Sequence, residues 1–342
     1  VLIYFKAYKI LNSIHHFNRR RHTMSIKKWI VGIAASAMLV TSGTALAQRA
    51  QFVSVLTGGQ SGVYYPVGVA LAQHYAENID NVRSTAQVTK ASAENMNLLQ
   101  AGRGEIAFSL ADTVEDAWNG REEAGFSKKL DNLRSITRLY NNYVQIIANP
   151  ESGISTIEDL KGKRISVGAA RSGTELNARA IFKAAGMDYS DFSKVEYLSF
   201  GESVELMKNR QIDATLQSAG LGVASIRDLA SAIKIVVVAI PEEIVANVGS
   251  ESYIADVIPA GTYDGQTEDV PTAAIPNFLI SHSGVSDDLA YEMTKVTYEK
   301  LDNLKSTHNA INTMDIKNAV TGMPAPIHPG AERYFKEQGI IE

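Results

Sequence analysis

Short runs of β-branched and other apolar residues alternate along the chain with longer stretches in which apolar residues recur every three or four positions. The short runs predict strands and the longer stretches predict helices. Strands are expected at residues 52–56, 82–88, 106–110, 165–167, 194–198, 214–217 and 235–240. Helices are expected at residues 65–77, 91–102, 175–185, 204–209 and 221–232. This alternation is typical of an α/β protein with mostly parallel sheets.

Two segments interrupt the alternation. Residues 133–149 form a run that is too long for one ordinary strand, and residues 271–282 form a second extended run. Two long strands on either side of a middle block are what a two-lobed fold with a two-strand hinge requires. We therefore expect one lobe to contain residues 48–140 and 271–342 and the other to contain residues 141–270. Two independent domains in series are the alternative.

A short helix is also expected between these two long segments. Residues 155–164 begin with a hydroxyl residue suited to a helix N-cap and contain Gly162 near their end, which favours a stop. The strand predicted at 165–167 follows directly. This helix therefore belongs to the middle block.

The amino-terminal segment has a different pattern from the rest of the chain. From Met24 it reads as a basic stretch, an apolar run over residues 29–40, and then Ala45-Leu46-Ala47, a small-x-small pattern of the kind that signal peptidase cleaves. A membrane anchor is the alternative. The apolar run, however, is well short of the roughly 20 residues that a membrane-spanning helix needs.

These features predict that the protein is exported. Residues 24–47 are expected to be a signal peptide that is cleaved after Ala47, which leaves Gln48 as the first residue in the periplasm. Residues 1–23 precede a complete signal peptide and contain no acidic residue, so we interpret them as an over-extended start.

Charge and cysteine content exclude several classes of function. Residues 1–47 hold seven of the 33 basic residues and none of the 37 acidic ones, so the remainder has 26 basic residues against 37 acidic, a net charge of −11. That balance argues against a nucleic-acid partner. With no cysteine, the chain has no disulfide, no thiolate catalysis and no cysteine-based zinc site. The histidines after residue 47 show no metal-ligand spacing, so we expect neither a metal nor a cofactor; they are His74, His282, His308 and His328.

A glycine-rich segment joins the first predicted strand to the first predicted helix. It runs from Thr57 to Pro66 and reads TGGQSGVYYP. Glycines let backbone N–H groups approach a ligand closely, and the start of a helix adds a partial positive charge, so a carboxylate or phosphate can bind there. The segment lacks the Gly-Lys-Ser/Thr of a P-loop and the G-x-S-x-G spacing of a hydrolase elbow. A plain glycine-rich turn is the alternative.

A second loop of the same design follows the strand predicted at 165–167. It reads GAARSGT over residues 168–174 and leads into a helix, so we expect the two loops to face one cleft. Arg171 in this loop is a candidate bidentate partner for a carboxylate, although a solvated surface arginine is the alternative. Tyrosines near both regions, such as Tyr65 and Tyr140, can supply flat walls with polar tips or can simply pack.

Several short segments, spread over nearly the whole chain after residue 47, occur in an order that matches a known family. They are Thr57-Gly58-Gly59 with Gly62, Tyr64-Tyr65-Pro66, Ala93-Glu94-Asn95 with Leu98, Leu99 and Gly102, Asp112, residues 159–164, Ser172-Gly173-Thr174, Gly220, and residues 326–334. In these segments the chain resembles the TAXI family of solute-binding proteins of TRAP transporters. The resemblance implies a type II periplasmic-binding-protein fold, with two α/β lobes that enclose the ligand and two crossover strands.

The resemblance also implies a function. Members of this family bind small organic solutes, commonly glutamate, glutamine or dicarboxylates that resemble 2-oxoacids. They deliver the solute to integral-membrane TRAP subunits, often fused into one chain, and an ion gradient rather than ATP drives uptake. We therefore expect a monomeric periplasmic receptor. An enzyme on the same bilobal fold and a sensory ligand-binding protein are the alternatives.

The candidate ligand-binding residues come from the two loops, the neighbouring strand ends and the resemblance. They are Thr57, Gly58, Gly59, Ser61, Gly62, Tyr64, Tyr65, Ser92, Asp112, Arg138, Tyr140, Arg171, Ser172, Gly173, Thr174, Gln217 and Gly220. Two departures from the family pattern matter. Leu110-Ala111 stands where the family usually has Gln-Ser, and Arg138 and Arg171 stand where smaller residues are usual. Fewer polar side chains on one side and additional cations on the other shift the expected ligand from glutamate toward a dicarboxylate such as 2-oxoglutarate.

Overall fold

The structure, a computed structural model, describes residues 50–342. The predicted start segment and signal peptide lie outside the described residues. Within the described part, no helix combines the length and the apolar character that crossing a membrane requires.

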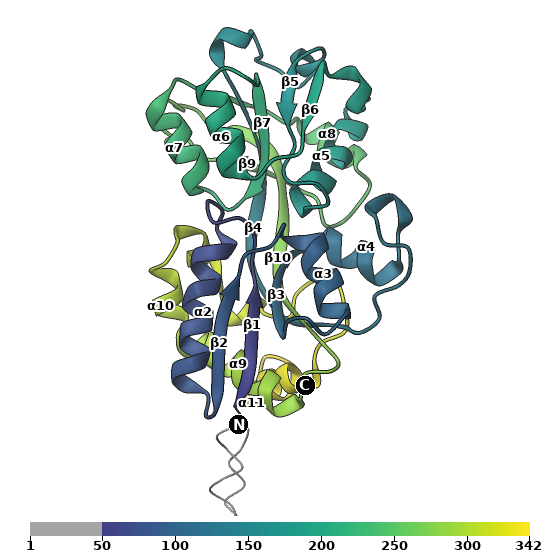
Figure 1. The fold of residues 1–342 in the computed structure, drawn as a ribbon, viewed down its shortest axis with the longest axis vertical. Coiled ribbons are helices and arrows are strands. Elements are labelled where there is room, and N and C mark those ends of the chain that lie inside the picture. The colour runs from purple at the N-terminus through teal and green to yellow at the C-terminus, as the bar shows by residue number, and fades with distance from the viewer. Residues whose placement is uncertain (1–49) are drawn as a thin grey trace, which may run out of the picture. The chain divides into compact units, whose positions relative to one another are not determined.

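One ten-stranded mixed sheet is the centre of the described part (Figure 1). Its main path has the order β2-β1-β3-β10-β4-β7-β5-β6, while β8 pairs with β4 and β9 pairs with β10. The strands are β1 (Gln51–Leu56), β2 (Val82–Gln87), β3 (Ile106–Leu110), β4 (Leu133–Ala148), β5 (Arg164–Ser166), β6 (Lys194–Glu196), β7 (Ala214–Ala219), β8 (Val236–Val238), β9 (Ile254–Ile258) and β10 (Val270–His282).

Helices cover both faces of this sheet. They are α2 (Tyr64–Asn78), α3 (Ser92–Gln100), α4 (Ala111–Asn119), α5 (Gly173–Ala184), α6 (Phe200–Lys208), α7 (Ala224–Ala232), α8 (Glu242–Asn247), α9 (Asp287–Glu299), α10 (Leu301–Lys305) and α11 (Pro329–Glu337). Four of these helices, α2, α3, α5 and α6, connect the strands of the parallel pairs β1–β2, β1–β3, β5–β6 and β5–β7. The expected α/β class is confirmed. The expectation of a mostly parallel sheet is wrong, because the two long strands β4 and β10 pair antiparallel with all of their neighbours.

The two long strands connect two α/β lobes. β4 pairs antiparallel with β10 along most of its length, then continues beside β7 and β8. On its other edge β10 pairs antiparallel with β3. In Figure 1 the lobe with β1, β2 and β3 lies below and the lobe with β5, β6 and β7 lies above, with β4 and β10 running through both. The expected bilobal architecture with two crossover strands is confirmed.

The short helix predicted at 155–164 is not formed. Only a 3-10 turn, Glu158–Leu160, is present. The Asp159 carboxylate accepts hydrogen bonds from the backbone N–H groups of Ser155, at 3.0 Å, and Thr156, at 2.9 Å. These bonds satisfy donors that precede the turn, as a capping carboxylate does, so they favour a helical start. Gly162, with φ of 73°, follows within two residues of the turn's end and prevents a longer helix.

Strand β9 is missing from the sequence-based assignment. It pairs only with β10 and lies off the main path of the sheet. Most of its residues are exposed, so the apolar alternation that marks a half-buried strand is weak there.

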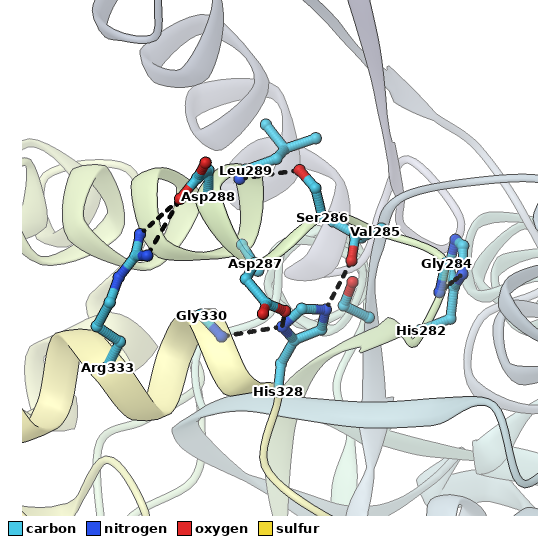
Figure 2. A network of polar contacts seen from close by, with 12 residues as sticks. His282, Gly284, Val285, Ser286, Asp287, Asp288, Leu289, His328, Gly330 and Arg333 are labelled. Carbon is cyan, nitrogen blue, oxygen red and sulfur yellow. Dashed lines mark hydrogen bonds and ion pairs between the residues drawn. The ribbon is translucent and has the colours of Figure 1, made fainter.

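The last helix is held to the rest of its lobe by a buried histidine (Figure 2). His328 is 1% exposed and lies at the N-cap of α11, where its Nδ1 accepts a hydrogen bond from the Gly330 N–H at 3.2 Å. With Nδ1 as acceptor, Nε2 carries the proton and donates to the Val285 carbonyl at 3.1 Å. A Cβ on Gly330 would lie 2.0 Å from the Asp287 carbonyl, so only glycine permits α11 to approach α9 this closely. His328 therefore has a structural role.

Candidate ligand-binding site

A cavity of about 350 Å³ lies between the two lobes, within the size range of small-molecule sites. Its lining comes from both lobes and includes the first residues of four helices. Val63 and Tyr64 contribute the start of α2, and Ser92 contributes the start of α3. Gly173 and Phe200 contribute the starts of α5 and α6.

The helices α2 and α3 begin without a side-chain cap. Val63, at the N-cap of α2, and Ala91, at the N-cap of α3, accept no hydrogen bond through a side chain. Ala91 has φ of 69°, a conformation that is costly for a residue with a Cβ. A Cβ on Gly58 would lie 3.2 Å from the Ala91 Cβ, a tight contact, so the glycine-rich loop packs closely against the start of α3. The first-turn N–H groups of both helices are left without a side-chain acceptor.

The helices α5 and α6 begin with serine caps. The Ser172 Oγ accepts from the Glu175 N–H at 3.1 Å. Ser199 and Glu202 form a capping box, in which Ser199 Oγ accepts from the Glu202 N–H at 3.4 Å and the Glu202 carboxylate accepts from the Ser199 N–H at 2.9 Å. In each helix the serine hydroxyl accepts a hydrogen bond from the third backbone N–H. The first two backbone N–H groups have no acceptor in the cap.

The two lobes touch at the starts of α3 and α5. A Cβ on Gly173 would lie 2.6 Å from Ser92 Oγ and 2.7 Å from Leu110 Cδ1. A Cβ on Gly62 would likewise lie 3.7 Å from the Phe200 ring. The contact at Gly62 would be an ordinary one, whereas at Gly173 the absence of a Cβ allows the two lobes to approach each other beside the cavity.

The electrostatics of this arrangement favour an anion. Each helix N-terminus carries roughly half a positive elementary charge, and four of them meet at one cavity. Ser218, 4% exposed and part of the lining, adds a hydroxyl that has no hydrogen-bond partner among the described residues. A buried polar atom without a partner is rare in native proteins and points to a group that is supplied from outside. Helix starts with free N–H groups are ready-made anion sites.

Tyr64 forms one wall of the cavity and is held rigidly. Its ring stacks on Phe108 with centroids 5.0 Å apart, and its hydroxyl donates to Asn277 Oδ1. Asn277 in turn donates to Asn142 Oδ1 at 2.9 Å, and Asn142 donates to the Ser218 carbonyl at 2.9 Å. Burial raises the pKa of Tyr64 well above its usual value, so the phenol stays neutral.

Eight of the sequence-predicted site residues line the cavity. They are Gly58, Gly59, Gly62, Tyr64, Ser92, Ser172, Gly173 and Thr174. The two glycine-rich loops that contain most of them are thus brought to one cavity.

The other predicted residues lie outside this lining, in the described part of the chain. Thr57 is fully buried, and its Oγ1 donates to the Gln87 carbonyl at 2.7 Å, which holds the ends of β1 and β2 together. Gln217 accepts from Ser225 Oγ at 2.6 Å.

A Cβ on Gly220 would lie 3.2 Å from the Tyr140 ring, and the buried Tyr140 hydroxyl has no partner among the described residues. Ser61 and Tyr65 are half-buried beside the loop.

The two arginines expected to supply positive charge also lie away from the lining. Arg171 is exposed and has φ of 60°. Arg138 donates to Asn141 Oδ1 at 3.3 Å. The loop turns at Arg171 so that Ser172 can cap α5, and this turn places the arginine at the surface.

Asp112 lies behind the cavity, where the lobes meet. Its carboxylate accepts hydrogen bonds from the Thr113 N–H at 2.7 Å, from Asn177 Nδ2 at 2.6 Å and from the Tyr253 hydroxyl at 2.7 Å. Burial raises the pKa of Asp112 to about 6. Asn177 and Tyr253 belong to the other lobe, so these hydrogen bonds join α4 to it.

Sequence reasoning missed part of the lining. The missed residues are Val63, Val88, Thr89, Lys90, Ala91, Leu110, Asn142, Ala169, Ala170, Tyr197, Ser199, Phe200, Glu202, Ser218 and Ala219. One signal was available for the start of α6. Ser199 and Glu202 have the S-x-x-E spacing of a capping box, which marks a helix beginning at Phe200 rather than at the predicted residue 204.

Over residues 50–342, no group of three or more histidine, aspartate or glutamate side chains is placed to hold a metal ion.

Comparison with known proteins gives a consistent fold. The chain is similar to the periplasmic binding protein BugD, with 11% identity over 84% of this chain and 98% of that one and a TM-score of 0.53. It is also similar to PhnD1 from Prochlorococcus marinus, solved with methylphosphonate, with 11% identity over 86% and 100% of the chains and a TM-score of 0.51. At such low identity these likenesses show the type II binding-protein fold. Residues 55–339 match the NMT1-like family over most of the sequence, and the chain therefore belongs to that family.

Proposed function

We propose that this protein is an exported solute-binding receptor that captures a small organic acid between its lobes and delivers it to a membrane transporter. The observation that carries this proposal is the meeting of four helix N-termini at one cavity, together with the unpartnered hydroxyl of Ser218. Backbone donors at helix starts recognise an anion without needing a charged side chain.

Within this function, the resemblance places the protein with the TAXI receptors of TRAP transporters. The matching residues Gly58, Gly59, Tyr64 and Ser172 to Thr174 all line the cavity, which supports the placement. The partners are then integral-membrane TRAP subunits, and an ion gradient drives uptake. One lobe is assigned residues 48–140 and 271–342 and the other residues 141–270, in a monomeric receptor.

Export follows from the predicted signal peptide. Cleavage after Ala47 puts the receptor in the periplasm, with Gln48 first. Intact-mass measurement of the protein from a periplasmic extract tests this directly, because a product that still contains Met24 would contradict it.

A binding role is favoured over an enzymatic one by the state of the ionisable side chains in the lining. An enzyme needs a nucleophile or a general base that is free to act on the substrate. The Glu202 carboxylate is committed to the capping box, and its hydrogen bonds from Ser199 lower its pKa. Tyr64 is held neutral by burial.

The test is a thermal-shift screen of the purified protein against organic acids, amino acids and neutral sugars. A ligand present at a hundred times its dissociation constant stabilises the fold by about 2.7 kcal/mol. The sequence favours a dicarboxylate such as 2-oxoglutarate or a glutamate-like acid, so both belong in the screen. We expect acids to raise the melting temperature. Stabilisation by sugars and by no acid would contradict the proposal.

A further inference from the structure

Charged side chains are confined to the rim of the cavity. In its lining, which belongs wholly to the described part of the chain, Lys90 and Glu202 are the charged residues, and both are exposed. Arg138 and Arg171 lie outside the lining. The helix starts can therefore receive one acid group, but the lining holds no buried cation for a second.

Most polar side chains of the lining are already hydrogen-bonded within the protein. The Thr89 hydroxyl lies 2.9 Å from the Thr57 carbonyl and 2.7 Å from Asn95 Oδ1, and both oxygens can accept its proton. Asn142, Ser172 and Ser199 are engaged as described above. The Ser218 hydroxyl has no hydrogen-bond partner among the described residues and remains available to a ligand. Ser218 and the helix starts can together bind one acid headgroup.

The rest of the lining is apolar. It includes Val63, Val88, Ala91, Leu110, Phe200 and Ala219. Leu110 is 1% exposed and packs where the two lobes meet, against Gly173. A wall of this kind gains free energy by covering apolar ligand surface.

We propose that the ligand is an amphipathic acid, with one carboxylate at the helix starts and an apolar body against the wall formed by Leu110 and its neighbours. This inference rests on the proposed function and narrows its ligand. A second carboxylate against the apolar wall would lose its hydration with no buried cation there to replace it, which is costly. Leu110 is then the residue that sets the preference for an apolar body.

The test is calorimetric titration of the protein with matched acids. Each pair has the same carbon skeleton: hexanoate and adipate, octanoate and suberate, 4-methylbenzoate and terephthalate. We expect the best monoacid to bind at least about tenfold more tightly than its diacid. A diacid that binds as tightly as its monoacid overturns the inference but leaves the proposed function standing. Failure of every acid to bind, or equal binding of hexanol and hexanoate, contradicts the proposed function itself.

Two variants of Leu110 test the role of the wall. Leu110→Gln places an amide there, and we expect it to weaken hexanoate binding about fivefold or more and to narrow the ratio between hexanoate and adipate. Leu110→Met keeps the volume and the apolar character, so its affinities should stay within about twofold of the wild type. Melting temperatures identify a variant that is merely unfolded. If a folded Leu110→Gln protein keeps the wild-type ratio of hexanoate affinity to adipate affinity, Leu110 is excluded as the specificity determinant.

Discussion

Asn177 donates a hydrogen bond from its side-chain amide to Asp112 Oδ2 across 2.6 Å, and the two residues belong to different lobes. Asp112 lies in the first turn of α4, two residues after Leu110, and Asn177 lies in the middle of α5. The Tyr253 hydroxyl donates to the same oxygen at 2.7 Å. The closed arrangement of the lobes therefore depends on the charge of one buried carboxyl group next to the cavity.

This contact predicts a pH dependence of stability. Burial raises the pKa of Asp112 from 3.8 to about 6, and the nearby carboxylates Asp116 and Glu115 add to the effect. A raised folded pKa means that the contribution of Asp112 is complete below about pH 4 and is lost as the pH rises through 6. The loss is about 2–3 kcal/mol, since one pKa unit corresponds to about 1.4 kcal/mol.

The measurement is urea unfolding between pH 4 and pH 8 for the wild type and Asp112→Asn. The pKa of Asp116 is also raised to about 6 by burial, and this contribution is present in both proteins. The variant should therefore show a shallower decline in the free energy of unfolding across this range. Parallel profiles for the two proteins would contradict the role given to Asp112.

Ser218 offers a test of the site that separates binding from stability. Ser218→Ala removes a buried hydroxyl that has no partner among the described residues, so the free protein should be unchanged or up to about 1 kcal/mol more stable. Acid binding should weaken about tenfold or more, because a hydrogen bond to a charged group is worth roughly 1.5–3 kcal/mol.

Thr215 provides the matched control for Ser218. It lies on the same strand, β7, and its buried Oγ1 also has no partner among the described residues, yet Thr215 does not line the cavity. Thr215→Val should leave affinity unchanged. Equal affinities for Ser218→Ala and the wild type would remove Ser218 from the site.

The position of Arg171 changes what its removal should do. The sequence predicts that Arg171→Ala weakens acid binding about tenfold, because a carboxylate partner is removed. In the structure Arg171 is exposed outside the lining, and we expect Arg171→Ala to keep its affinity within about threefold of the wild type. Calorimetry at low and high salt checks this, because an exposed charge acts only at long range and is screened by salt. A tenfold loss at high salt would restore Arg171 as a direct ligand-binding residue.

His328 predicts a second pH effect, of opposite sign. Burial lowers its pKa, although the Asp287 carboxylate, 3.9 Å from Nδ1, opposes this. A lowered pKa means that the contribution of His328 is present above its ordinary value of 6.5 and is lost as the pH falls through the folded pKa.

Two substitutions test this role of His328. At pH 8, His328→Ala should cost about 2–4 kcal/mol, because the helix cap is removed and a buried carbonyl is left unpaired. His328→Asn keeps a cap and should cost less. Thermal unfolding at pH 8 and pH 5 should show a smaller gap between wild type and His328→Ala at the lower pH, and a gap that widens on acidification would contradict the assignment.

The elements that sequence patterns predicted well are those whose local signals agree with their environment. The run at 133–149 became β4, Leu133–Ala148, and the run at 271–282 became β10, Val270–His282, and both strands are long because they pass through both lobes. The loops around Gly58 and Gly173 line one cavity because each joins a strand to a helix in its own lobe.

Tertiary packing determines the features of the site that the sequence does not predict, such as the direction of individual side chains. Ser218 and Thr215 lie three residues apart on one buried strand and therefore on opposite faces of the sheet, but nothing local indicates which of the two faces meets the cavity. The direction of Arg171 depends on a turn with positive φ that the neighbouring cap imposes. The meeting of four helix starts is a property of two closed lobes, and no single segment encodes it.

The most direct test of the central claim is the anomalous diffraction map of crystals grown with 6-bromohexanoate. We predict a bromine peak against the apolar wall near Leu110, with carboxylate density at the starts of α2, α3, α5 and α6 and within hydrogen-bond distance of Ser218. A bromine peak in the cavity with the carboxylate directed to solvent, or binding elsewhere on the protein, would contradict the account.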